Sequence, residues 1–69
     1  MKKGDLITLY DTWSSYSLIQ NPNAKSDVVV GYIRKGELSL VLKVGIASVK
    51  ILSPNGIIGW IWKPRVKVL

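Results

Sequence analysis

The chain has 69 residues, enough for one domain over residues 1–69, and 48% of them are hydrophobic, which excludes a disordered tail. It contains no cysteine, which excludes disulfides and thiolate metal sites, and no histidine, the usual general base and commonest metal ligand. The formal net charge is +6, and it is uneven: residues 1–34 contain four basic and three acidic residues, whereas residues 35–69 contain six basic and one acidic residue. This basic excess fits attraction to phosphates or acidic proteins, and equally lysines that only keep an apolar protein soluble.

The first half of the chain contains two predicted strands separated by a long segment. Asp5–Tyr10 is rich in Leu, Ile, Thr and Tyr, and Val28–Arg34 begins with three β-branched residues, so both suit a pleated surface. The intervening Asp11–Asp27 contains turn-forming Asn and Pro residues, with room for a short strand at Tyr16–Ile19.

Two further strands are predicted from alternation. Leu38–Val44 places Ser39, Val41 and Lys43 on one face, and on the other face, expected to be core, Leu38, Leu40, Leu42 and Val44. Ala47–Leu52 follows, with Val49 and Ile51 inward and with Ser48 and Lys50 outward.

The sharpest local signal is the turn sequence Ser53-Pro54-Asn55-Gly56. Proline suits the second position of a type I turn, and glycine supplies the positive φ that closes a bulged hairpin, so Ala47–Leu52 is expected to pair with Ile57–Trp62. Pro64 then stops the sheet, which predicts a 3₁₀ turn over Lys63–Arg65. A last strand is expected at Val66–Leu69, with Val66 and Val68 inward and Lys67 outward.

These elements predict an all-β domain, a small antiparallel SH3-like barrel of five to six short strands. The main alternative, the OB-fold, normally has a helix between its third and fourth strands, and no stretch of this chain has helical spacing.

Several motifs resemble known small barrels. Four segments, spread over nearly the whole chain, look like the SH3-like barrel proteins encoded by marine tailed bacteriophages of the cyanophage type: Lys3-Gly4-Asp5-Leu6-Ile7, Val49-Lys50-Ile51-Leu52, Gly56 to Trp60, and Arg65-Val66-Lys67-Val68-Leu69. The triplet Gly59-Trp60-Ile61, with Val66 five residues later, also resembles the ending of bacterial SH3 domains. The paired tryptophans and the acidic loop of proline-peptide-binding SH3 domains are missing, so PxxP binding is not expected. The resemblance implies a fold and a phage source, with the host cytoplasm or the virion as location.

The strongest functional hint is a stripe of apolar residues in the last long strand. If Ile57, Gly59 and Ile61 face the core, then Ile58, Trp60 and Trp62 lie together on the outer face, where tryptophans serve as interface anchors or as stacking platforms for bases. The alternative is that these tryptophans fold under the long segment and close the end of the barrel.

Two aromatic residues of the long segment are further candidates. Trp13 and Tyr16 either extend the tryptophan stripe into a groove or only pin the segment to the barrel. The candidate phosphate contacts are the basic residues of the second half: Lys43, Lys50, Lys63, Arg65 and Lys67.

No arrangement of residues predicts catalysis. The four carboxylates are scattered among turns, the serines lack a histidine to activate them, and no phosphate-binding glycine motif or metal-ligand spacing is present. We therefore expect no enzyme activity, no cofactor, no metal and no small-molecule substrate.

Two function classes remain from the sequence. The favoured one is a binding or assembly module that contacts a protein partner or a second copy of itself; the alternative is a nucleic-acid-binding barrel that uses its basic, tryptophan-containing face. A weaker third reading is a binder of anionic cell-surface or virion polymers.

Neither secretion nor membrane insertion is expected. The longest apolar stretch, Val28 to Ile33, is far shorter than the roughly 20 residues needed to span a bilayer. Gly4-Asp5 follows Met1-Lys2-Lys3 at once, where a signal peptide would begin its apolar region. We expect a soluble protein with no membrane partner.

Overall fold

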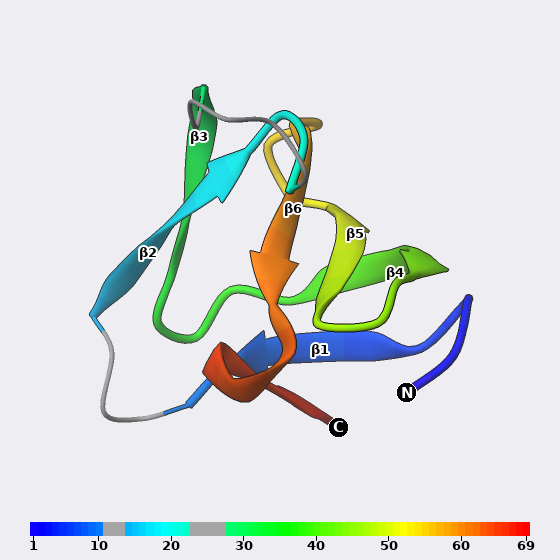
Figure 1. Ribbon diagram of the computed structural model, residues 1–69. Coiled ribbons are helices and arrows are strands. Elements are labelled where there is room, and N and C mark those ends of the chain that lie inside the picture. The colour runs from blue at the N-terminus through cyan, green and yellow to red at the C-terminus, as the bar shows by residue number, and fades with distance from the viewer. Residues whose placement is uncertain (11–13, 23–27) are drawn as a thin grey trace.

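The computed structural model describes residues 1–10, 14–22 and 28–69 (Figure 1). In these residues the chain forms seven strands and one 3₁₀ turn, η1: β1 (Leu6–Leu9), β2 (Ser15–Ile19), β3 (Val29–Arg34), β4 (Ser39–Val44), β5 (Ser48–Leu52), β6 (Ile58–Trp62), η1 (Lys63–Arg65) and β7 (Val66–Val68). The prediction of an all-β chain is confirmed. The predicted count of five to six strands is wrong, because the segment around Tyr16 is a full strand that pairs with β3 and touches β6.

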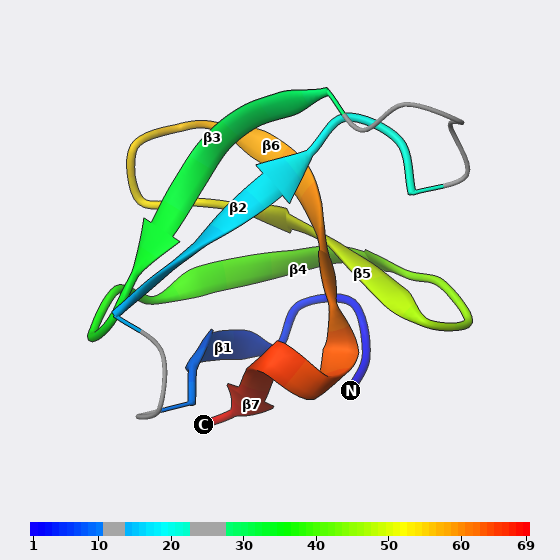
Figure 2. The ribbon, with the colours of Figure 1, turned by 60° about the vertical axis from the view of Figure 1, so that its left-hand side comes forward.

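All seven strands belong to one antiparallel sheet in the order β3-β2-β6-β5-β4-β1-β7. The first and last strands of the chain are neighbours, since β1 pairs with β7 from Ile7↔Val68 to Leu9↔Val66. No ladder joins β3 to β7, so the sheet is not closed. Figure 2 shows the strong twist of this sheet, with β2 and β3 crossing over the β4–β5 pair and β1 and β7 lying beyond it.

The core lies on the inner face of this bent sheet. It consists of nine aliphatic side chains with almost no exposed surface, drawn from all seven strands: Ile7, Leu9, Leu18, Ile33, Val41, Val49, Ile51, Ile61 and Val66. The inward positions predicted for Val49, Ile51 and Val66 are confirmed. Val68 is exposed, so its predicted inward position is wrong.

The predicted core of β4 is wrong for Leu38, Leu40 and Leu42, whereas Val44 packs against the core as predicted. The fully buried side chains there are Ser39 and Val41, whereas Leu38 is exposed and Leu40 and Leu42 are only half-buried. The register against β5 shifts between Val41 and Lys43, so Leu42 is an extra residue in the strand. Such a bulge lets Val41 and Val44 both reach the core, although their three-residue spacing does not fit strict alternation.

The β5–β6 hairpin forms as predicted. The backbone N–H of Gly56 donates to the carbonyl of Ser53, and Gly56 has a φ of 83°. The Ser53 hydroxyl Oγ also accepts the backbone N–H of Ile57, at 3.1 Å. These bonds set the register from Ser48↔Trp62 to Leu52↔Ile58. The predicted 3₁₀ turn is confirmed as η1, with Pro64 in its first turn.

Strand β6 crosses β2 with no space for a side chain between them. A Cβ atom on Gly59 would lie 2.8 Å from the Cβ of Leu18 and 3.3 Å from the carbonyl oxygen of Ile19. Only glycine permits this approach. The contact seats β2 against β6 and thereby places Ile19 beside Trp60.

No helix in the described part of the chain has the length and apolar character needed to cross a membrane.

Candidate binding face

The β6 side chains are arranged as the sequence predicts. Gly59 and Ile61 are buried, whereas Ile58 and Trp62 are 50% and 53% exposed and Trp60 is half-buried. We call the sheet face that carries these three residues the outer face.

The first feature of the outer face is a row of four residues on four adjacent strands, which we call the basic row. The strand register places Ile19 beside Trp60, Trp60 beside Lys50, and Lys50 beside Lys43. Directly opposite residues in antiparallel strands have Cβ atoms about 5 Å apart. The basic row therefore places Lys50 directly beside Trp60 and Lys43 one strand further from it.

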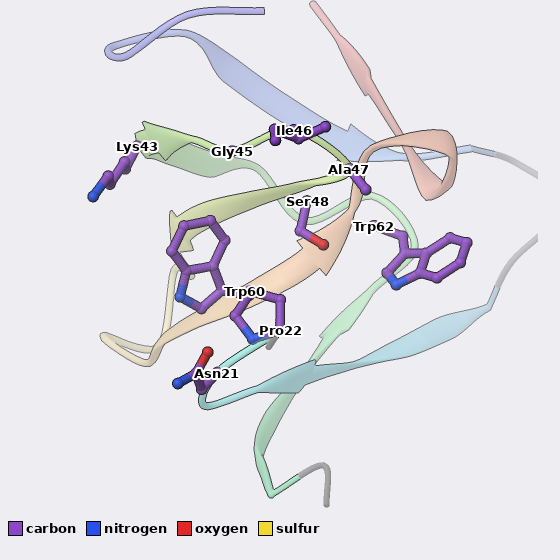
Figure 3. A pocket seen from close by; sticks show the side chains of 9 residues that line it. All are labelled: Asn21, Pro22, Lys43, Gly45, Ile46, Ala47, Ser48, Trp60 and Trp62. Carbon is purple, nitrogen blue, oxygen red and sulfur yellow. The ribbon is translucent and has the colours of Figure 1, made fainter. Parts of the chain in front are cut away.

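The second feature is an open groove of about 490 Å³ between the two tryptophans, which we call the tryptophan groove. Figure 3 shows Trp60 and Trp62 on opposite sides of it, with Ser48 between them and Lys43 beyond the Trp60 side. Its lining comes from β4, β5, β6, the β4–β5 turn and two residues that follow β2: Asn21, Pro22, Lys43, Gly45, Ile46, Ala47, Ser48, Trp60 and Trp62. A smaller hollow of about 90 Å³ is also lined by both tryptophans, together with β2 residues that include Tyr16, Ser17 and Ile19.

The third feature is a row of aliphatic residues parallel to the basic row, which we call the apolar row. Leu6 pairs with Leu40, Leu40 with Leu52, and Leu52 with Ile58, across four adjacent strands. Leu6 and Ile58 at its ends are 46% and 50% exposed, and the two central leucines are half-buried. Four large aliphatic side chains thus form a continuous line on the surface.

The predicted phosphate contacts do not form one cluster. Lys43 and Lys50 lie in the basic row, and Lys63 follows Trp62 in η1. Arg65 is turned toward the ring of Tyr16, with its guanidinium carbon 5.4 Å from the ring centre. Lys67 lies on β7, three strands away from β5 in the sheet order.

Two of the four acidic side chains, Asp5 and Glu37, belong to the described residues. Asp5 accepts the backbone N–H of Lys2 at 2.9 Å, and Glu37 accepts that of Arg34 at 2.7 Å, so both are engaged in turns. Within the described residues, neither Lys43 nor Lys50 has a carboxylate partner.

Of the two aromatic candidates in the early segment, Trp13 and Tyr16, only Tyr16 belongs to the described residues. Tyr16 pairs with the buried Ile33 and packs against the core, and it also lines the smaller hollow together with both tryptophans. Trp13 lies outside the described residues.

Sequence reasoning missed two parts of this face. The groove wall at the β4–β5 turn includes Ile46, which is 100% exposed. Its place next to Gly45 in a turn is the sequence feature that indicates an exposed isoleucine. The apolar row was missed because Leu40 was assigned to the core.

The groups along the outer face and its two hollows are indole rings, aliphatic chains, ammonium groups, the hydroxyls of Tyr16, Ser17 and Ser48, and the carboxamide of Asn21. Among the described residues, no three metal-ligating side chains come together.

Comparison with known protein families, curated proteins and solved structures finds no match to this chain. Its function therefore has to be argued from the outer face itself.

Proposed function

We propose that the protein is a small SH3-like barrel of the phage type and a non-enzymatic assembly module, in which the apolar row binds the same row of a second copy. The observation that carries this proposal is the continuous, partly exposed line of Leu6, Leu40, Leu52 and Ile58.

The barrel assignment is supported by three features of the chain. The first and last strands pair, a 3₁₀ turn precedes the last strand, and the strongly twisted sheet surrounds one aliphatic core. The segments that resemble phage SH3-like barrels correspond to the start of β1, to β5, to β6 and to β7. Either the host cytoplasm or the virion would suit such a module.

Self-association is supported by the cost of leaving this row in water. Each buried aliphatic side chain contributes roughly 1.5–3 kcal/mol, so partial exposure of four leaves several kcal/mol available to a contact. A chain of 69 residues without cysteine has a small core and no disulfides, and oligomerisation is a common way to stabilise such a domain.

The geometry of the row suits a symmetric dimer. A two-fold axis along the row places each residue opposite its own copy, so that four aliphatic side chains meet four more. The same axis puts the Lys43–Lys50 pairs of the two copies on opposite sides of the contact, which limits their repulsion.

The test is the mass in solution, measured by sedimentation equilibrium as the concentration rises to millimolar. We expect the wild-type chain to dimerise and the double variant Leu6→Gln/Ile58→Gln to stay monomeric. The matched control is Val28→Gln/Val29→Gln, which alters two side chains of nearly equal exposure, 51% and 47%, at the β3 edge of the sheet.

Two results would contradict the proposal. One is a wild-type monomer at the highest concentration. The other is loss of association in the β3 variant alone, which would place the contact at the sheet edge. Circular dichroism melting of each variant is the control that tests whether it is folded.

A further inference from the structure

The basic row and the tryptophan groove have properties that the dimer contact does not use. Trp60 and Trp62 are two residues apart on one strand, so their Cα atoms are separated by about 6.7 Å. Both rings border an open groove, and Trp62 is more than half exposed. Such a pair of rings can receive two successive flat groups of an extended chain.

Two lysines lie in the same row as Trp60. Lys43 and Lys50 are direct cross-strand neighbours, and like charges in that position destabilise a sheet. In the described part of the chain no carboxylate offsets them. An anion bound between the two ammonium groups removes this repulsion.

We propose that the tryptophan groove binds single-stranded nucleic acid, with bases stacked on Trp62 and Trp60 and with phosphates against Lys50 and Lys43. This site is separate from the apolar row and does not depend on dimerisation. The proposed ligand combines the two chemistries of the groove, an aromatic face and a regularly repeated negative charge.

A single strand fits the groove better than a duplex. The bases of a duplex are stacked on one another and show only their edges, whereas an unpaired base presents a face to an indole ring. Every base has an aromatic face that can stack on an indole ring, and Ser48 between the rings is buried, with 5% of its surface exposed, so it gives no base-specific readout (Figure 3). The site is therefore expected to tolerate different sequences.

The experiment is fluorescence anisotropy of a labelled oligothymidine of about 12 nucleotides, a length within the range of small single-strand-binding domains. Binding is measured at several salt concentrations between about 50 and 200 mM. A duplex of the same length and a polyglutamate peptide serve as competing probes. Two phosphate contacts predict that the logarithm of the binding constant falls by about 1.4 per tenfold rise in salt.

The variants distinguish stacking of bases on Trp62 from non-specific electrostatic attraction to the basic protein. Trp62→Ala is expected to weaken binding about tenfold or more at every salt concentration, and Trp62→Phe to retain most of the affinity. Lys43→Ala and Lys50→Ala are each expected to reduce the salt slope by about 0.7. The matched control is Lys67→Ala, which removes the same charge from β7, outside the groove.

Four results would overturn the proposal: no binding of the single strand at low salt, equal binding of the duplex, preferential binding of polyglutamate, or a loss in Lys67→Ala as large as in Lys50→Ala. The dimer is tested independently, because Leu6→Gln/Ile58→Gln leaves the groove and its charges unchanged and is expected to bind the oligonucleotide normally. Circular dichroism melting of every variant confirms that it is folded.

Discussion

At the scale of single residues, the position of Trp60 depends on Gly45, which has no side chain. A Cβ atom on Gly45 would lie 3.2 Å from Cζ3 of the Trp60 ring and 2.9 Å from the carbonyl oxygen of Ser48. The ring therefore occupies the space that a larger residue would fill, at the side of the tryptophan groove.

This contact predicts the effect of Gly45→Ala. We expect the added methyl group to displace the Trp60 ring, to lower stability by about 1–3 kcal/mol and to weaken oligothymidine binding. Denaturant unfolding of Gly45→Ala, Trp60→Leu and the double variant forms a double-mutant cycle that measures the share due to the ring. If Gly45→Ala lowers the free energy of unfolding equally in the Trp60→Leu background, the clash with the Ser48 carbonyl accounts for the whole loss. The Trp60 ring is then not displaced.

At the scale of elements, the sequence predicts the pairing of two strands where a short turn between them sets the register. The turn from Ser53 to Gly56 fixes the β5–β6 register, and that register places Trp60 and Trp62 on one face, as predicted. The β4 strand could not be assigned in this way. Its apolar residues occupy both faces, and the bulge at Leu42 arises in the pairing with β5, which alternation along one strand does not reveal.

The contact between β6 and β2 predicts a local effect of Gly59→Ala. The new methyl group would meet the backbone and Cβ of β2, so we expect a loss of roughly 1–3 kcal/mol and a separation of the β2–β3 pair from β6. Hydrogen exchange should accelerate more at amides of β2 and β3 than at those of β4 and β5. Gly56→Ala is the control, because its cost comes from a φ of 83° with no atom within 4 Å. Uniform acceleration across the sheet in Gly59→Ala would show that β2 and β3 do not open separately.

At the scale of the whole molecule, the outer face joins two surfaces of different character. Its apolar row ends at Leu6 and Ile58, and its basic row ends at Ile19 and Lys43. The composition indicates both apolar and basic residues, but it does not predict that they form two rows side by side. That arrangement follows from the sheet order, because β4 and β5 contribute one residue to each row and β6 contributes a tryptophan to the basic row and an isoleucine to the apolar one.

The two surfaces should respond to salt in opposite directions. Each copy carries a net charge of +6, so two copies repel, and salt that shortens the Debye length from about 30 Å at 0.01 M to about 10 Å at 0.1 M should strengthen the dimer. The same change should weaken oligothymidine binding, because counterions then compete with Lys43 and Lys50. Sedimentation equilibrium and anisotropy on one sample series measure both trends. A dimer that weakens with salt would mean that ion pairs, rather than the apolar row, hold the copies together.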